Sequence, residues 1–145
     1  MSDEILTAPY VLEYTYKRSV GPVIGRFLAA LREGRLEGAR TRSGRVIVPP
    51  VEYDESGFAI EDLVSLPSTG RVTTWSWVAE PRPRHPLPRP FAWALIQIDG
   101  ADTAMLHAVD AGVISKMKTG LRVRARFRAE RKGEIRDLEC FEVCE

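Results

Sequence analysis

Residues 121–128 read LRVRARFR, a stretch in which apolar and basic side chains alternate without a break. Successive side chains of a β-strand point to opposite faces, so this spacing predicts a strand with one apolar and one basic face. The apolar face would hold Leu121, Val123, Ala125 and Phe127, and the basic face Arg122, Arg124, Arg126 and Arg128.

The same period of two runs through the chain from residue 71 onward and predicts five strands. They cover residues 71–80, 90–99, 103–109, 121–130 and 134–143. A short helical piece, DAGVISKMK at 110–118, separates the third strand from the fourth. Five strands with this insertion predict a mainly β protein with an OB-type Greek-key barrel, and an SH3-like barrel is the rival architecture.

Before the barrel, the pattern predicts a short extended segment at 10–16, YVLEYTY, and then one amphipathic helix. Ser19 is the expected cap of that helix, Pro22 favours its first turn, and Gly34 ends it. One apolar stripe on the helix is expected to pack on the barrel or on another protein, and it comprises Val23, Phe27, Leu28 and Leu31.

Between helix and barrel lie RTRSGRVIVPP at 40–50 and VEYDESGF at 51–58. Each half has the outline of a metal-binding knuckle, with a tight turn closed by Gly44 or Gly57, but neither contains a cysteine or histidine. We therefore divide the chain into an N-terminal strand and helix (1–36), a ribbon-like segment without metal (37–62) and a barrel (63–145).

Composition limits the class of protein. The chain has 145 residues, of which 44% are hydrophobic and 28% charged, and this is enough for one domain with a core. No apolar run approaches the roughly 20 residues that span a bilayer, and the acidic start does not resemble a secretory signal, so we expect a cytoplasmic protein without a membrane partner. Cys140 and Cys144 are expected to be free thiols.

Net charge is only +1, but the basic residues are clustered. The loop PRPRHPLPRP at 81–90 carries Arg82, Arg84, His85 and Arg89 without an acid. The arginine face of residues 122–128 has two interpretations. It is either a track for phosphate groups, or a ladder that pairs with acids such as Asp137 and Glu139 on the next strand.

Trp75, Trp77, Phe91 and Trp93 are spaced so that the aromatic rings within each strand share a face. In OB barrels that bind single strands such rings stack on bases, whereas elsewhere they fill a barrel or an interface. Neither His85 nor His107 has an acidic partner or nucleophile at an informative spacing, and no catalytic motif is present. We assign no catalytic residue.

A family resemblance joins these features. The stretch LREGRLEGARTRSGRVIVPPVEYDESGF at 31–58 resembles the helix and ribbon of the acyl-CoA-associated zinc-ribbon/OB-fold family, with Gly44, Pro49, Pro50 and Gly57 in matching places. The resemblance continues through STGRVTTWSWV at 68–78, RPFAWALIQIDG at 89–100 and MKTGLRVRARF at 117–127. The family's four zinc positions fall on Arg40, Ser43, Asp54 and Gly57, which implies that the metal has been lost, because structural zinc needs thiolate or imidazole ligands.

That resemblance implies a non-catalytic small subunit of a thiolase-fold aldolase or thiolase, with an enoyl-CoA hydratase as the alternative partner. It is similar to the small partner of aldolases that cleave a steroid CoA thioester by a retro-aldol step. The implied assembly is a heterotetramer with two copies of each chain. The CoA thioester would be the substrate of the complex, and no cofactor is bound by this chain alone.

Two sets of residues follow as candidates. Arg82, Arg84, His85 and Arg89 are expected to contact the phosphates of CoA. The expected partner interface comprises Tyr14, Tyr16, Phe27, Pro49, Pro50, Trp75 and Trp77. Two other functions stay open: a binder of single-stranded nucleic acid, which we do not expect at this net charge, and an acyl-CoA-binding or lipid-binding module that acts alone.

Overall fold

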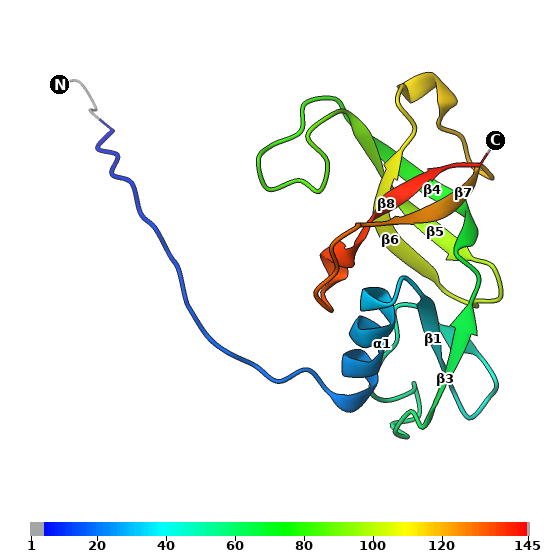
Figure 1. The fold of residues 1–145 in the computed structure, drawn as a ribbon. Coiled ribbons are helices and arrows are strands. Elements are labelled where there is room, and N and C mark those ends of the chain that lie inside the picture. The colour runs from blue at the N-terminus through cyan, green and yellow to red at the C-terminus, as the bar shows by residue number, and fades with distance from the viewer. Residues whose placement is uncertain (1–4, 145) are drawn as a thin grey trace.

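A computed structural model describes residues 5–144, and its main part is a closed five-stranded barrel (Figure 1). The strands are β4 (Thr69–Val78), β5 (Phe91–Ile98), β6 (Ala104–Asp110), β7 (Arg122–Phe127) and β8 (Leu138–Val143). Around the barrel they follow the order β4-β5-β6-β8-β7, and β7 closes it by pairing with β4. Only β6 and β8 pair in parallel. This is the OB-type Greek-key barrel predicted from the sequence, and not the SH3-like alternative.

All five predicted strands are present. The helical piece between the third and fourth is a single 3-10 turn, η1 (Ile114–Lys116). The last strand begins four residues later than predicted, at Leu138, because residues Ile135–Asp137 form another 3-10 turn, η2. Glu134 and Asp137 stabilise η2 as a capping box, in which each side chain accepts a hydrogen bond from the other residue's backbone.

Helix α1 (Pro22–Arg32) precedes the barrel and begins at Pro22, as predicted, but Ser19 does not cap it. The N-cap residue is Gly21, which has no side chain to offer. The carboxylate of Glu52 supplies the cap instead, because it accepts hydrogen bonds from the N–H groups of Val23 at 3.2 Å and Ile24 at 3.0 Å. Sequence spacing cannot reveal this cap, since its acceptor lies about 30 residues downstream.

A small antiparallel sheet lies beside α1 and has the order β2-β1-β3. Its strands are β1 (Leu36–Arg40), β2 (Val46–Ile47) and β3 (Asp62–Leu66). The helix, this sheet and the barrel share one hydrophobic core, to which the helix contributes Phe27 and Leu31. The helix stripe therefore packs on its own chain, which is one of the two outcomes that the sequence allowed.

The two turns of the ribbon-like segment are held by side chains. We call residues 40–60 the two-turn segment. In the first turn, the hydroxyl of Thr41 lies 2.9 Å from that of Ser43 and accepts a hydrogen bond from the N–H of Arg45. In the second, the carboxylate of Asp54 accepts hydrogen bonds from the N–H groups of Ser56 and Phe58.

Contacts between side chains join the two turns to each other. The guanidinium of Arg42 lies over the ring of Phe58, 3.7 Å from its centroid, and Arg45 pairs with Glu55 at 3.5 Å. Of the four positions that align with zinc ligands, Arg40 pairs instead with Asp62, and Gly57 has no donor atom in its side chain. These residues do not fit a zinc ion.

The two-turn segment is also attached to the barrel. The N–H of Val46 donates to the carboxylate of Asp102 at 2.7 Å, and the N–H of Val48 donates to the hydroxyl of Thr103 at 2.8 Å. Both acceptors lie in the connection from β5 to β6. The edge of the small sheet is therefore fixed to the barrel, because its backbone N–H groups donate hydrogen bonds to side chains of the β5–β6 connection.

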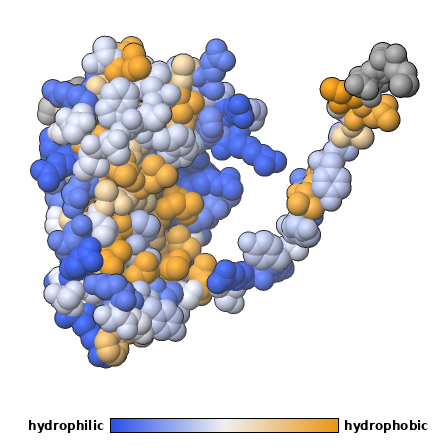
Figure 2. Space-filling view, turned by 180° about the vertical axis from the view of Figure 1, so that it is seen from behind, coloured by the Kyte–Doolittle hydropathy of each residue, from blue (hydrophilic) through white to orange (hydrophobic). Residues whose placement is uncertain are grey.

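Residues 5–20 lead away from α1 as an extended arm (Figure 1). They form no helix or strand, so residues 10–16 have no strand neighbour with which to pair. Their large apolar and aromatic side chains are exposed, namely Ile5, Leu6, Tyr10, Val11, Leu12, Tyr14, Tyr16 and Val20. Figure 2 shows the arm clear of the body, with apolar residues along it.

Candidate functional site

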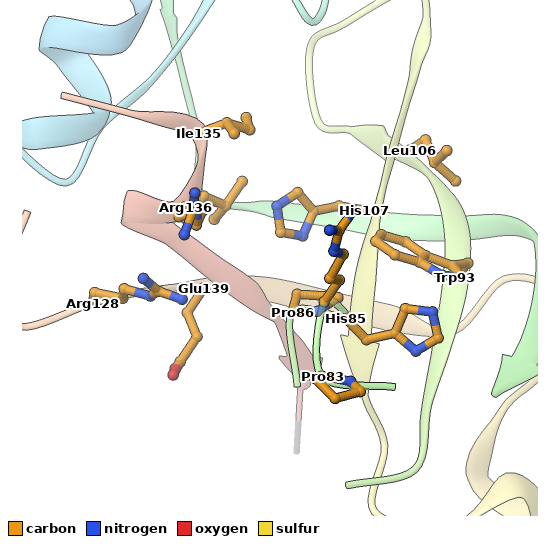
Figure 3. A pocket seen from close by; sticks show the side chains of 12 residues that line it. Pro83, His85, Pro86, Trp93, Leu106, His107, Arg128, Ile135, Arg136 and Glu139 are labelled. Atoms are coloured by element: carbon orange, nitrogen blue, oxygen red, sulfur yellow. The ribbon is translucent and has the colours of Figure 1, made fainter. Parts of the chain in front are cut away.

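A cleft of about 880 Å³ lies on the outside of the barrel (Figure 3). We call it the β4–β8 cleft because its walls come from the loop after β4 and from the start of β8. Its volume lies within the range of roughly 300–1,000 Å³ that is typical of ligand sites. The lining residues are Pro83, Arg84, His85, Pro86, Trp93, Leu106, His107, Arg128, Ile135, Arg136, Leu138 and Glu139.

One wall is the proline-rich loop between β4 and β5. A tight turn at residues 82–85 is closed by two hydrogen bonds, because the N–H of His85 donates to the carbonyl of Arg82 and the N–H of Arg82 donates to Nδ1 of His85. The imidazole of His85 then packs edge-on against Phe91, at 5.6 Å between ring centroids. Phe91 is fully buried, so this contact fixes the turn, with Arg84 in its middle, to the barrel.

The opposite wall is the connection from β7 to β8. Its loop is held by the buried carboxylate of Asp137, which accepts hydrogen bonds from the N–H groups of Lys132, Gly133 and Glu134. Burial alone raises the pKa of Asp137, but these three bonds outweigh it and the pKa is lowered. Arg131 also donates to the carbonyl of Arg32 at the end of α1. This wall, which carries Arg128 and Arg136, is therefore braced against the helix.

Strands β5 and β6 form the floor of the cleft through Trp93, Leu106 and His107. His107 is only 8% exposed, and its Nδ1 is a buried polar atom without a hydrogen-bond partner. Burial lowers the pKa of His107, which favours the neutral imidazole. A buried polar atom without a partner costs roughly 1–3 kcal/mol of stability.

Charges in the cleft are mostly positive. No acidic side chain of residues 5–144 lies at ion-pair distance from Arg84 or Arg128, and Arg136 has only Glu134, at 4.0 Å. Glu139 is the acid of the lining, and its carboxylate is already bound by Arg126 at 2.8 Å. The arrangement suits an anionic ligand.

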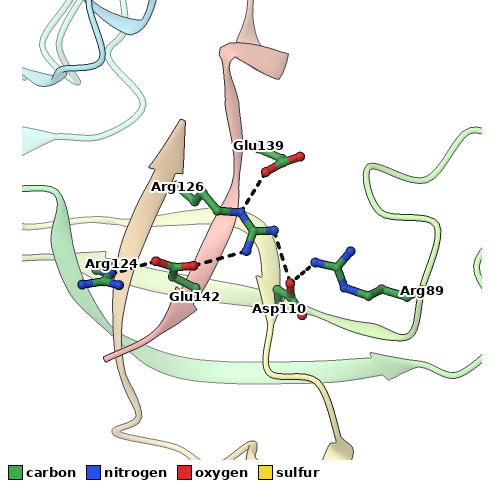
Figure 4. A network of polar contacts seen from close by, with 6 residues as sticks. All are labelled: Arg89, Asp110, Arg124, Arg126, Glu139 and Glu142. Atoms are coloured by element: carbon green, nitrogen blue, oxygen red, sulfur yellow. Dashed lines mark hydrogen bonds and ion pairs between the residues drawn. The ribbon is translucent and has the colours of Figure 1, made fainter. Parts of the chain in front are cut away.

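The arginine face of β7 is a ladder of ion pairs (Figure 4). Arg126 contacts Glu139 at 2.8 Å and both Glu142 and Asp110 at 3.2 Å, while Arg124 pairs with Glu142 at 2.8 Å. At the other end of β7, Arg122 binds both carboxylate oxygens of Asp99. The ladder interpretation therefore holds for these three arginines. Glu139 is a partner, as expected, but Asp137 is not, because the backbone of the β7–β8 loop occupies its carboxylate.

The residues expected to contact CoA lie in two different places. Arg84 and His85 line the cleft, and Arg82 is exposed at the base of the same turn. Arg89 lies elsewhere, because its guanidinium pairs with Asp110 and thereby joins the ladder. Sequence reasoning missed Arg128, Arg136 and His107 as members of this site. Nothing in their spacing indicates it, since they come from three separate segments that only the closed barrel brings together.

The proposed interface residues also differ in exposure. Tyr14 and Tyr16 are exposed on the arm, and Pro49 is exposed on the two-turn segment. Phe27 and Pro50 are buried within the chain and offer no surface to a partner. The half-buried rings of Trp75 and Trp77 pack against the main core of the barrel.

Three further observations concern chemistry. Within residues 5–144, no group of three or more His, Cys, Asp or Glu side chains is placed to hold a metal ion. In the same range we find no helix with the length and apolar character needed to cross a membrane. Cys140 and Cys144 are free, and burial raises the pKa of the Cys140 thiol to about 12, so it is not a nucleophile at neutral pH.

A family model described as the C-terminal OB-fold domain of ChsH2 matches residues 63–128, which cover most of the barrel. None of the curated proteins matches the chain.

Several solved structures share the fold, among them the two that follow. One is a protein of unknown function from the DUF35 family of Sulfolobus solfataricus, with 20% identity and a TM-score of 0.61 over 85% of this chain and 84% of that one. The other is described as the Ltp2-ChsH2(DUF35) aldolase, with 16% identity and a TM-score of 0.63 over 88% of this chain and 98% of that one. The resemblance inferred from the sequence is thus confirmed for the barrel domain and for the fold.

Proposed function

We propose that this chain is a non-catalytic OB-fold subunit of an aldolase complex that acts on acyl-CoA substrates. The observation that carries the proposal is the likeness of the fold, over 88% of this chain, to a chain described as the Ltp2-ChsH2(DUF35) aldolase, joined with the match of residues 63–128 to the ChsH2 OB-fold domain. The partner would be a larger thiolase-fold aldolase, and the bond-breaking residues would belong to that subunit.

The exposed arm supports the proposal that this chain has an obligate partner. Residues 5–20 expose eight large apolar or aromatic side chains, each by 55% or more. Exposed apolar surface of this kind marks a protein interaction site, and ordering the arm against a partner would bury it. Tyr14 and Tyr16 are the best anchors, because tyrosine is enriched among residues that dominate binding energy.

The reaction would be a retro-aldol cleavage of the side chain of a steroid CoA thioester, in a cytoplasmic heterotetramer with two copies of each chain. The CoA thioester would be held mainly by the large subunit. Arg82, Arg84 and His85 are the residues of the proline-rich loop that we propose to reach its phosphates.

The ion pairs of β7 argue against the nucleic-acid alternative. Arg122, Arg124 and Arg126 are neutralised by acids of the same chain, so they do not form a free phosphate track. Nucleic-acid binders of this fold combine a basic groove with exposed aromatic rings, and Trp75 and Trp77 are instead packed against the core.

Co-expression with candidate thiolase-fold aldolases tests the proposal. The complex should survive affinity purification of either chain and run as one species in size-exclusion chromatography with light scattering, which also gives the stoichiometry. Failure to assemble with any thiolase-fold aldolase or thiolase, while the isolated chain is monomeric and folded, would reject the proposed function.

A further inference from the structure

We infer that the β4–β8 cleft is a binding site for a phosphorylated nucleotide, with the phosphates against Arg84, Arg128 and Arg136 and the planar base against Trp93. The choice of nucleotide rests on the proposed function, because the nucleotide end of CoA is an adenosine with phosphates on the ribose. The site itself rests on the cleft, which this chain forms without a partner.

Three guanidinium groups from opposite walls surround the same space. Arg84 comes from the turn after β4, and Arg128 and Arg136 come from the connection between β7 and β8. Guanidinium forks match phosphate oxygens in geometry and charge. Because neither Arg84 nor Arg128 faces an acid of the described chain, both charges are available to a ligand.

The remaining lining explains why a bare phosphate would not fill the site. Trp93 is half-buried, and Pro83, Pro86, Leu106 and Ile135 add apolar surface next to the charges. Figure 3 shows these side chains around the same hollow as His107 and Arg136. A cleft with an apolar side and a cationic side suits a flat ring that carries phosphates.

His107 lines the cleft but does not offer its unpaired atom to a ligand. Its Nδ1 is buried and has no hydrogen-bond partner within residues 5–144, and the ring packs edge-on against Phe141 of the core. Because this atom has almost no accessible surface, the site rests on the arginines and on Trp93.

Calorimetric titration of the full isolated chain tests the inference. The ligands are adenosine 3′,5′-bisphosphate, adenosine and inorganic phosphate, and the proteins are the wild type, Arg84→Gln and Arg128→Gln. Arg45→Gln is the matched control, since Arg45 is exposed on the two-turn segment and does not line the cleft. Arg84 lies in an exposed turn, so its variant should fold even if the Arg128 variant does not.

We expect saturable binding of the bisphosphate, about tenfold weaker for each arginine variant and unchanged for Arg45→Gln. Adenosine and phosphate should each bind far more weakly. Equal affinity for phosphate and the bisphosphate, or no effect of Arg84→Gln and Arg128→Gln, would overturn the nucleotide site. Assembly with the aldolase is measured separately on the same variants, so a chain that assembles but binds no nucleotide refutes this inference and leaves the proposed function standing.

Discussion

The carboxylate of Glu52 accepts a hydrogen bond from the N–H of Ile24 at 3.0 Å, which ties the two-turn segment to the first turn of α1. The first N–H groups of a helix have no partner within it, and Gly21 at the N-cap cannot provide one. The carboxylate of Glu52 therefore caps the helix in place of an N-cap side chain. This gives the two-turn segment a structural role that needs no metal.

Replacing Glu52 with alanine should lower the free energy of unfolding by about 1 kcal/mol, the usual effect of losing a cap. Glu55→Ala is the control, because Glu55 lies in the same segment and forms an exposed ion pair with Arg45, which should contribute little. Urea denaturation of both variants checks the prediction. An equal effect of the two substitutions would contradict the capping role.

Gly21→Ala should act through the same contact. A Cβ atom at this position would lie 2.1 Å from Oε1 of Glu52, so the carboxylate has to move away from the helix. We expect a loss of stability comparable to that of Glu52→Ala, and a double variant that is less destabilised than the sum of the two. Additive losses in the double-mutant cycle would show that Gly21 and Glu52 are not coupled.

Arg126 is the centre of the ion-pair ladder and is only 30% exposed. Arg126→Gln leaves Asp110, Glu139 and Glu142 without their shared cation, and we expect it to reduce the free energy of unfolding by about 1–2 kcal/mol. Arg45→Gln removes one exposed pair and should change little. The loss at Arg126 should shrink in high salt, which denaturation at two ionic strengths measures.

Acid should weaken the pair between Arg122 and Asp99. The bond from Arg122, followed by that from Thr69, lowers the pKa of Asp99 to about 2 in the folded chain. In an unfolded chain the pKa of aspartate is about 3.9, so the contribution of this pair is complete above pH 4 and is lost as the pH falls from about 4 towards 2.

Urea denaturation between pH 6 and pH 2.5 tests this dependence. The difference in stability between the wild type and Asp99→Asn should be constant at the upper end and should shrink below pH 4. Arg122→Gln should show the same profile, because it removes the other half of the pair. A difference that does not change with pH would contradict the assignment.

The arm should matter for assembly and not for folding. Tyr14 and Tyr16 are 78% and 81% exposed, so the double variant Tyr14→Ser/Tyr16→Ser should unfold at the same urea concentration as the wild type. Its affinity for the aldolase partner should fall by more than about tenfold. Glu13→Gln, a polar change on the same exposed arm, is the control. Unchanged affinity of the tyrosine variant, measured by surface plasmon resonance, would remove the arm from the interface.

The barrel was predictable because each of its strands shows a local alternation of apolar and polar residues. Alternation at residues 121–128 identifies β7, and Leu121 and Val123 are indeed in the core. The cap at Glu52 and the loop held by Asp137 could not be predicted, because both depend on acceptors whose position the folded chain decides. Ser19 is the residue type that caps helices, but the chain uses a carboxylate from the two-turn segment instead.

The candidate site was predictable only in part. A basic loop without acids indicated Arg84 and His85, which do line the cleft, but the same reasoning grouped Arg89 with them although it pairs with Asp110. Alternation assigned Arg128 to the arginine face. The strand ends one residue earlier, at Phe127, and Arg128 lines the cleft instead. Termination of a strand is set by its neighbours, which local sequence does not show.

Reconstitution tests whether this chain serves a larger aldolase. The retro-aldol cleavage rate of a purified thiolase-fold aldolase with its CoA thioester is measured as this chain is added in increasing amounts. We expect activity that rises and saturates at the stoichiometry of the complex, while this chain alone shows none. A large subunit that is fully active without this chain, or a chain that cleaves the thioester by itself, would contradict it.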